Sequence, residues 1–174
     1  MAVSEELFKK GMRRLGGAVT IVTASDGASW AGLTATAVTS LSAEPPRILS
    51  CINRQGQTFE ILSKGRSLCI NVLATKHKDL AMRFAGMDGV QETERFDEER
   101  WAVSVTGAPY LKDAMVSFHC DVDSILDAGS HAIVIGAIKD IHCAPDANSA
   151  MEAEDDGLFY MDGKWAKLIS FDGV

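Results

Sequence analysis

The stretch LTATAVTSLSAEPPRILSCINRQGQTFEIL, residues 33–62, decides the fold of this chain. In its first half, small residues mix with Thr and Ser, which predicts that residues 30–42 form one strand. Side chains alternate with period two along a strand, so the hydroxyl groups at positions 34, 36, 40 and 42 should share one face. Pro45-Pro46 interrupts the pattern, residues 47–53 predict the next strand, and residues 56–65 predict a short helix.

The sequence before this stretch predicts an amphipathic helix over residues 4–15. Ser4 is the expected N-cap, and Gly16-Gly17 is the expected end of the helix. Its apolar positions form one stripe, made of Leu7, Phe8, Met12 and Leu15. A strand rich in β-branched residues is then expected over residues 18–25, and the turn signal at Asp26-Gly27 predicts a hairpin with the next strand.

The sequence after this stretch predicts further strands and one more helix. Strands are expected over residues 67–73, 115–126 and 130–143, and a helix is expected over residues 76–86. Residues 86–113 are expected to form an irregular charged segment, and residues 144–157 an exposed acidic loop. The chain is expected to close with a hairpin that turns at Asp162-Gly163. Six or more strands without βαβ alternation favour a closed or nearly closed antiparallel β-barrel with helices attached. A chain of 174 residues is expected to form one domain over residues 1–174.

Composition and missing motifs exclude several classes of protein. The net charge of −7 disfavours nucleic acid as a partner, and no apolar run approaches the ~20 residues of a membrane helix. The N-terminal residues lack the apolar core of a secretory signal, so a soluble, cytoplasmic protein is expected. Four cysteines without a C-x-x-C pair predict reduced side chains in or near a core, and no metal site is expected. The chain also lacks a dinucleotide fingerprint and a P-loop.

Two interpretations of the hydroxyl-rich strand remain open from the residues alone. It is either a half-exposed strand with its Thr and Ser side chains in water, or one wall of a ligand site. In the second case, small residues let a planar ring approach the backbone while hydroxyls and amides bind its polar edges. Asn53, Gln57 and Thr58 follow at the start of the predicted helix, where free amides suit a phosphate group.

Several ordered motifs resemble those of the flavin reductase-like family, the small reductases that supply reduced flavin to two-component monooxygenases. Besides residues 33–62, the matching segments are GGAVTIVTA, LAMRFAG, GAPYLKDAMVSFHCDV, GSHAIVIGAI and LFYMDGKWAKL, so the resemblance covers most of the chain. The resemblance implies an antiparallel split β-barrel of the FMN-binding kind and a homodimer. It also implies non-covalent FAD or FMN, with NADH or NADPH as the hydride donor.

The resemblance assigns site residues by position. Thr34, Ala35, Thr36, Ala37 and Val38 would line the flavin ring, and Ser40, Cys51, Ile52, Asn53, Gln57 and Thr58 would bind its ribityl and phosphate groups. Arg83 and Phe84 would extend the phosphate or adenosine contacts, and His131 would lie on the nicotinamide side. No residue is assigned with certainty as catalytic, because hydride transfer is the chemistry of the flavin itself.

Two departures from the family pattern affect these expectations. This chain has Gly129-Ser130-His131 where many members have G-D-H, which leaves the orientation of His131 open. Residues 54–57 are also poorer in hydroxyl groups than the usual phosphate loop. Two alternatives stay open beside the flavin reductase: a corrin reductase of cobalamin biosynthesis with a bound flavin, and a flavin- or haem-binding module without turnover. The sequence does not choose between FAD and FMN, or between NADH and NADPH, and it does not name the downstream oxygenase.

Overall fold

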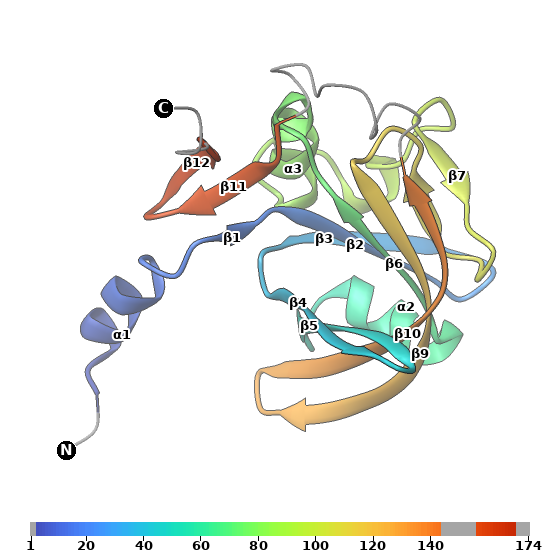
Figure 1. Cartoon of the computed structure of the whole chain (residues 1–174), viewed down its shortest axis with the longest axis horizontal. Helices are drawn as coiled ribbons and strands as arrows, with labels where there is room; N and C mark the ends of the chain where they lie inside the picture. The colour runs from blue at the N-terminus through green and yellow to red at the C-terminus, as the bar shows by residue number, and fades with distance from the viewer. Residues whose placement is uncertain (1–2, 144–155, 170–174) are drawn as a thin grey trace.

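The computed structural model describes residues 3–143 and 156–169, and its largest element is a seven-stranded antiparallel sheet (Figure 1). The order of its strands is β3-β2-β6-β9-β10-β5-β4. Their bounds are β2 (Thr20–Ser25), β3 (Trp30–Ala35), β4 (Val38–Ala43), β5 (Pro46–Asn53), β6 (Ser67–Val72), β9 (Val116–Ala128) and β10 (His131–Cys143). The two edge strands of the sheet, β3 and β4, are consecutive in the sequence and are joined by a short connection. The sheet therefore curls so that its two edges meet at this connection.

Two smaller sheets and the helices complete the described part of the chain. The small sheets are β1-β11-β12 and β7-β8, with bounds β1 (Gly17–Ala18), β7 (Trp101–Val103), β8 (Pro109–Leu111), β11 (Leu158–Met161) and β12 (Lys164–Lys167). The helices are α1 (Glu5–Met12), α2 (Gln57–Gly65) and α3 (Lys78–Phe84), with two 3-10 turns, η1 (Thr75–His77) and η2 (Glu92–Glu94). The segment over 86–113, expected to be irregular, thus contains the β7-β8 sheet. The prediction for residues 144–155 lies outside the described residues.

The prediction of one continuous strand over residues 30–42 is wrong. Thr36 and Ala37 lie outside any strand, and a β-bulge at Leu41 shifts the register between Ser40 and Ser42. The strand breaks because its two halves pair with different neighbours, β3 with β2 and β4 with β5. The two interruptions also break the alternation, so the four hydroxyl groups do not share one face.

Within the described residues, two apolar clusters form the core. The first fills the curled sheet, and α2 closes it with Ile61 and Leu62. The second lies under α3 and includes Phe84 and Trp101. A Cβ at Gly65 would lie 1.8 Å from the backbone oxygen of Ser25, so only glycine lets the end of α2 approach the β2–β3 turn this closely.

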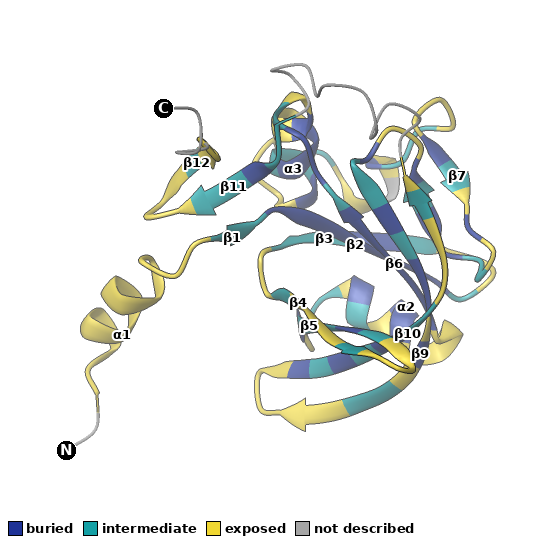
Figure 2. Ribbon diagram, in the orientation of Figure 1, coloured by how far each residue is buried: buried dark blue, intermediate teal, exposed yellow. Residues whose placement is uncertain are grey.

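The N-terminal helix stands apart from these clusters (Figure 2). The predicted cap is confirmed, since Ser4 Oγ accepts a hydrogen bond from the backbone N–H of Leu7 at 3.3 Å. The helix ends at Met12, before the expected stop at Gly16-Gly17. None of its residues is buried, and the side chains of Leu7 and Phe8 are 61% and 58% exposed. The predicted apolar stripe is therefore present but uncovered.

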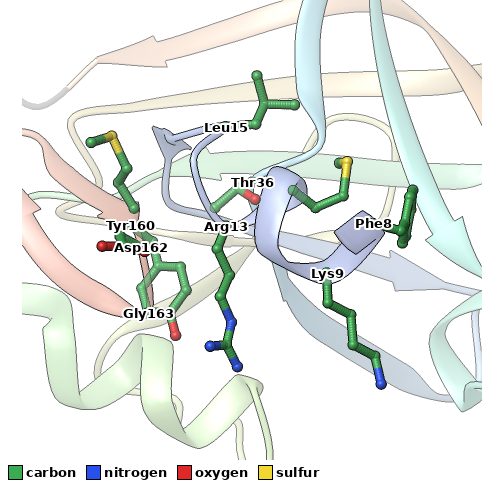
Figure 3. Close-up of a pocket in the computed structure, with 10 residues that line it drawn as sticks. Phe8, Lys9, Arg13, Leu15, Thr36, Tyr160, Asp162 and Gly163 are labelled. Carbon is green, nitrogen blue, oxygen red and sulfur yellow. The ribbon is translucent and has the colours of Figure 1, made fainter. Parts of the chain in front are cut away.

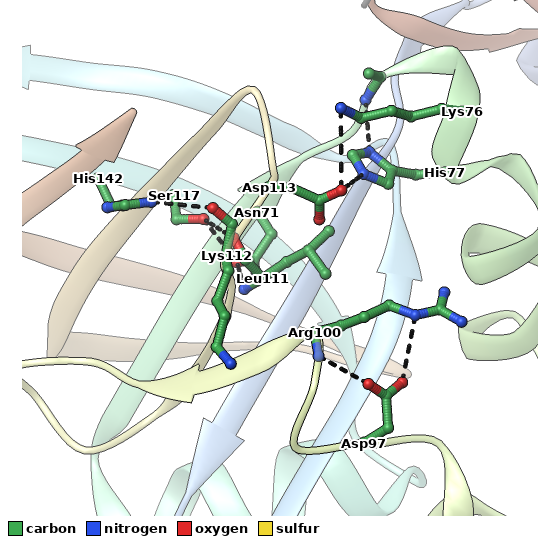
Figure 4. A network of polar contacts seen from close by, with 11 residues as sticks. Asn71, Lys76, His77, Asp97, Arg100, Leu111, Lys112, Asp113, Ser117 and His142 are labelled. Atoms are coloured by element: carbon green, nitrogen blue, oxygen red, sulfur yellow. Dashed lines mark hydrogen bonds and ion pairs between the residues drawn. The ribbon is translucent and has the colours of Figure 1, made fainter. Parts of the chain in front are cut away.

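A buried polar network, the Asn71 network, joins β2, β6, β8 and β9 (Figure 4). Asn71 Nδ2 donates to the carbonyl of Ile21 at 3.0 Å, and its Oδ1 accepts from the backbone N–H of Leu111 and from Ser117 Oγ, both at 2.8 Å. The Asn71 side chain is fully buried, and these bonds satisfy its polar atoms inside the core. The network thus fixes the β7-β8 sheet to the main sheet.

Candidate functional site

The β3–β4 connection is the centre of the candidate site. Thr36 and Ala37 are exposed, and Gly17 of β1 approaches them so closely that a Cβ there would lie 3.0 Å from the Thr36 backbone oxygen. Thr20 Oγ1 also donates to the carbonyl of Ala35 at 2.8 Å. Packing on one side therefore holds the connection in place and leaves its other side open.

The end of β5 lies against this connection. The backbone N–H of Cys51 donates to the carbonyl of Ala37 at 3.0 Å, which joins the end of β5 to the connection. In the β5–β10 ladder Asn53 lies opposite His131. Segments that the sequence analysis assigned to the flavin and to the nicotinamide are thus brought together. We call Thr36, Ala37, Cys51, Asn53 and His131 the crossover site.

Helix α2 begins a few residues after Asn53, so the positive end of its dipole lies next to the crossover site. Its N-cap is Gly56, which has no side chain to satisfy the first-turn amides. Asn53 shapes the turn before the helix, because its Oδ1 accepts from the backbone N–H of Gln55 at 3.0 Å. The side chain of Gln57 is exposed, whereas that of Thr58 is buried. The uncapped helix end suits an anionic group, as the sequence analysis expected.

The serine that stands in place of the usual acid before His131 supplies a partner for the imidazole. Ser130 Oγ lies 2.9 Å from His131 Nδ1. The loop is held further by Arg54, whose backbone N–H donates to the carbonyl of Ser130 at 3.1 Å and whose guanidinium pairs with Asp127. The backbone N–H of Gly129 and the Arg54 guanidinium both lower the pKa of Asp127, which keeps this ion pair charged. The exposed His131 ring is therefore oriented without a neighbouring carboxylate.

Several other assigned side chains have contacts within the protein. Thr34 Oγ1 donates to the carbonyl of Ala81 at 2.7 Å, so this hydroxyl is used to hold α3. Ile52 and Phe84 are buried in the two core clusters, where their side chains have almost no free surface for a ligand. Arg83 pairs with Asp88 at 3.0 Å. The structure favours a packing role for the side chains of Ile52 and Phe84, in contrast to the assigned ligand contacts.

The remaining assigned residues flank the crossover site. Ala35 and Val38 are half-buried and pack on the first core cluster from the ends of β3 and β4. Ser40 is exposed on β4, two positions after Val38. These positions leave the predicted contacts open, and direct contact with a ligand stays a prediction for each of them.

Two cavities meet at Thr36. One of about 190 Å³ lies between the end of β3, the residues that follow α3 and the β11–β12 hairpin, and the other, of about 300 Å³, lies between α1 and that hairpin (Figure 3). Tyr160 and Trp165 line the first cavity, and their rings pack edge to face with centroids 5.0 Å apart. Neither aromatic residue is among the site residues expected from the sequence. Their place beside Asp162-Gly163 in the final hairpin was the available signal.

The residues present fit a flavin. Small side chains at Ala35 and Ala37 allow a flat ring to approach the backbone, and the adjoining cavities provide space beside Thr36. Asn53 and Gln57 present amides at the surface, and the start of α2 suits a phosphate. The arrangement can bind a large planar molecule with a charged end, and it requires no strong general acid.

The cysteines offer no activated nucleophile in the core. All four are unpaired, and burial raises the pKa of the Cys69 thiol strongly and that of Cys120 to about 12. Cys69 and Cys120 are buried, which confirms the expectation of core cysteines for these two, whereas Cys51 is half-buried and Cys143 is exposed.

Within residues 3–143 and 156–169, no helix is both long and apolar enough to cross a membrane.

Comparison with known proteins decides the family. A model of the flavin reductase like domain matches residues 12–168. The chain belongs to this family. "FMN reductase (NADH) RutF" of Agrobacterium fabrum is 37% identical over 161 residues, which cover 92% of this chain and 87% of the relative. The protein of the same name from Escherichia coli is 36% identical over 140 residues, covering 80% of this chain and 84% of the relative.

A solved flavin reductase structure confirms the fold class. BorF, the flavin reductase component of a bacterial two-component tryptophan halogenase, superposes with a TM-score of 0.82 at 27% identity, covering 96% of this chain and 99% of BorF. The prediction of a mainly β, antiparallel split barrel with attached helices is thus confirmed. The resemblance stated from the sequence motifs is also confirmed.

Proposed function

We propose that this protein is an NADH-dependent flavin reductase that transfers hydride from NADH to a non-covalently bound flavin. Family membership and two relatives named FMN reductase (NADH) support this activity. The structural observation that carries the proposal is the crossover site, where the β3–β4 connection, the end of β5 and the loop before β10 meet beside the uncapped start of α2.

Each part of the site has a distinct task. A bound flavin supplies the ring that accepts the hydride, and the chain supplies binding and orientation. The backbone of Thr36 and Ala37 would support the flat ring, while Asn53, Gln57 and the first-turn amides of α2 would bind its polar and charged end. His131, oriented by Ser130, would contact the nicotinamide and set its distance from the ring.

An anaerobic titration tests the activity directly. Purified protein is mixed with NADH and with FMN or FAD, and NADH absorbance is followed over time. We expect NADH to be oxidised in proportion to the flavin present. A protein that binds flavin without oxidising NADH would be a binding module, which would contradict the proposal.

The same titration separates the proposal from the corrin reductase alternative. A cob(II)yrinate derivative is added as a second acceptor in place of excess flavin. We expect flavin to be the better acceptor and to be released after reduction, as a supplier of reduced flavin to an oxygenase requires. A flavin that stays bound while the corrin is reduced would favour the alternative.

We further propose that the protein acts as a homodimer in which α1 packs on the second copy. A helix of eight residues is only marginally stable alone, and here its apolar stripe is exposed. The cavity beside this helix reaches Thr36 of the crossover site. A second copy that covers α1 would therefore also close one side of the flavin site and exclude water from it.

Sedimentation tests the dimer. Wild-type protein should sediment as a dimer of the 18.7 kDa chain, and Phe8→Glu should shift the equilibrium toward monomers. Lys10→Glu, on the polar side of the same helix, is the matched control and should leave the dimer intact. A monomeric wild type with saturating flavin would contradict this part of the proposal.

A further inference from the structure

Arg54 connects the end of β5 to the turn between β9 and β10 through three contacts. Its backbone N–H donates to the carbonyl of Ser130 at 3.1 Å, and its Nη1 donates to the carbonyl of Gly129 at 3.3 Å. The same Nη1 forms an ion pair with Asp127 Oδ2. One residue therefore holds both residues of the turn and the last part of β9.

The turn lies at the exposed end of the β9–β10 hairpin. Residues 126–131 are all exposed, so burial of apolar surface contributes little to their position. Gly129 has a φ of +78°, and its backbone N–H donates to Asp127 Oδ1 at 2.8 Å. Asp127 thus uses one carboxylate oxygen inside the turn and the other on Arg54. Its carboxylate links the hydrogen bond of the turn to the rest of the protein.

The other side of Arg54 faces helix α2. Its Cζ atom lies 6.0 Å from the centroid of the Phe59 ring, at the limit of a cation–π contact. The residues on either side of Arg54 shape the start of the helix, because the backbone N–H of Gln55 donates to Asn53 Oδ1 at 3.0 Å. Arg54 therefore lies between the segment proposed for the charged end of the flavin and the turn that precedes His131.

The direction of the His131 ring depends on this turn. His131 follows the turn directly, and Ser130 Oγ lies 2.9 Å from its Nδ1. The carbonyl of Ser130 is in turn held by the backbone N–H of Arg54. A turn that moved between conformations would carry both residues away from this arrangement. The apparent affinity of a ligand falls by the fraction of time that the binding conformation is populated.

We propose that Arg54 and Asp127 are positioning residues for hydride transfer: their ion pair holds the Gly129-Ser130 turn on the start of α2, so that His131 is in place when NADH binds. The inference rests on the proposed function, because it places NADH on the side of the site that carries His131. Neither side chain of the pair has to touch NADH or the flavin, since both act through His131.

Steady-state kinetics with NADH and saturating FMN test the pair. Arg54→Gln and Asp127→Asn should each raise KM for NADH about threefold to fivefold, the effect of an exposed ion pair with additional hydrogen bonds. The value of kcat should change by less than about twofold, because the lost contact serves the ground state and the transition state equally. The Kd of FMN should stay within about twofold of wild type.

This split between KM and kcat distinguishes positioning from a structural role. The two side chains are 40% and 65% exposed, so both variants should fold normally. Partial unfolding would reduce the amount of active enzyme, which lowers kcat and leaves KM unchanged. Arg54→Lys keeps a cation beside Asp127 and should keep KM within about twofold of wild type. A KM in Arg54→Lys as high as in Arg54→Gln would overturn the role of the ion pair.

Lys64→Gln is the matched control. Lys64 forms an exposed ion pair with Glu60 at 2.6 Å, near the other end of α2 from the turn. Its replacement removes the same charge from the same helix and should leave KM and kcat for NADH unchanged. An equal rise of KM in Lys64→Gln and Arg54→Gln would be an effect of surface charge and would contradict the proposal.

A double-mutant cycle with His131→Ala tests whether the pair acts through the histidine. If it does, adding Arg54→Gln to His131→Ala should lower kcat/KM for NADH by less than about 1.5-fold beyond His131→Ala alone. Losses that multiply would mean that Arg54 acts independently of His131, which would overturn the proposal. A Kd of FMN raised more than about threefold in Arg54→Gln would assign the guanidinium to the flavin and also overturn it.

The two levels of inference fail in different ways. If the wild-type protein does not oxidise NADH, the proposed function fails. If the wild type is active and His131→Ala is impaired, but Arg54→Gln and Asp127→Asn have wild-type KM, only the positioning role of the ion pair is wrong.

Discussion

The crossover site and the Asn71 network place the same side chain, asparagine, in opposite circumstances. Asn71 is fully buried, and hydrogen bonds with Ile21, Leu111 and Ser117 use both of its side-chain polar atoms. Asn53 is exposed, and its Oδ1 accepts one short-range bond from the backbone N–H of Gln55. The Asn71 network uses its hydrogen-bonding capacity for folding, whereas the crossover site keeps part of its capacity for a ligand. Substitutions can therefore separate stability from binding in this molecule.

The largest effect is expected from Asn71→Leu. The substitution removes the partners of three buried polar groups, at Ile21, Leu111 and Ser117, and each unsatisfied group costs about 1–3 kcal/mol. We expect the free energy of unfolding to fall by about 3 kcal/mol or more in urea denaturation. Asn53→Leu is the matched control and should change stability by less than about 0.5 kcal/mol. Equal losses in the two variants would remove the distinction between the two regions.

The next largest effect is expected from His131→Ala. If His131 positions the nicotinamide, its loss should lower kcat/KM for NADH by about tenfold, or roughly 1.4 kcal/mol. The Kd of the flavin should stay within about twofold. Steady-state kinetics and a flavin titration measure the two quantities separately. A flavin affinity that falls together with kcat/KM would mean that the histidine contacts the flavin instead.

A related variant sharpens the role of Ser130. Its hydroxyl oxygen lies 2.9 Å from His131 Nδ1, so Ser130→Ala should release the ring and lower kcat/KM for NADH severalfold, by about 0.5–1.5 kcal/mol. Ser130→Asp, which restores the acid common in the family, should retain activity. If Ser130→Ala has wild-type kinetics, this contact does not orient the ring.

Smaller effects are expected from Thr36→Val and Asn53→Leu on flavin affinity. Each substitution removes hydrogen-bonding capacity at the crossover site, which should weaken flavin binding by about 0.5–1.5 kcal/mol. The thermal stability of the protein without flavin should be nearly unchanged. A collapse of that stability would show that these side chains serve the fold, and the half-exposed strand would then be the correct interpretation.

The smallest effect concerns pH and His77. Burial lowers the pKa of His77 below its usual value, and its Nδ1 accepts the backbone N–H of Ala74 at 3.1 Å, which requires the neutral ring. The unfolded chain therefore binds more protons as pH falls through about 6.5, so the stability that His77 contributes is present above this pH and lost below it. His77→Gln should flatten the dependence of the unfolding free energy between about pH 7 and pH 5.5. An unchanged slope would contradict a neutral buried His77.

The sequence predicted the elements of the main sheet well because each has a strong local signal. The hairpins at Asp26-Gly27 and Asp162-Gly163 are confirmed, as is the helix after Gly56. The break at Thr36 and the bulge at Leu41 were missed, because both depend on which neighbouring strand each segment pairs with. Such pairings join residues that are distant in the sequence.

The candidate site was predictable only in part for the same reason. The motif identified the segments that meet at Ala37, Cys51 and Asn53, and the ladder brings His131 to them. The motif could not show that Phe84 is core, since its burial depends on Phe96 and Trp101 in another segment. Tyr160 and Trp165 lie in a matching segment but were not assigned to the site, which they reach through the final hairpin.

The tight contact at Gly65 has a consequence for the thermodynamics of binding. Because this residue fixes the far end of α2 against the β2–β3 turn, the helix has little freedom to slide or tilt. The entropy of ordering its first-turn amides is thus lost during folding, before any ligand arrives. An anionic group that binds there meets a preorganised dipole, so the free energy of that contact contributes to affinity instead of being spent on ordering the helix.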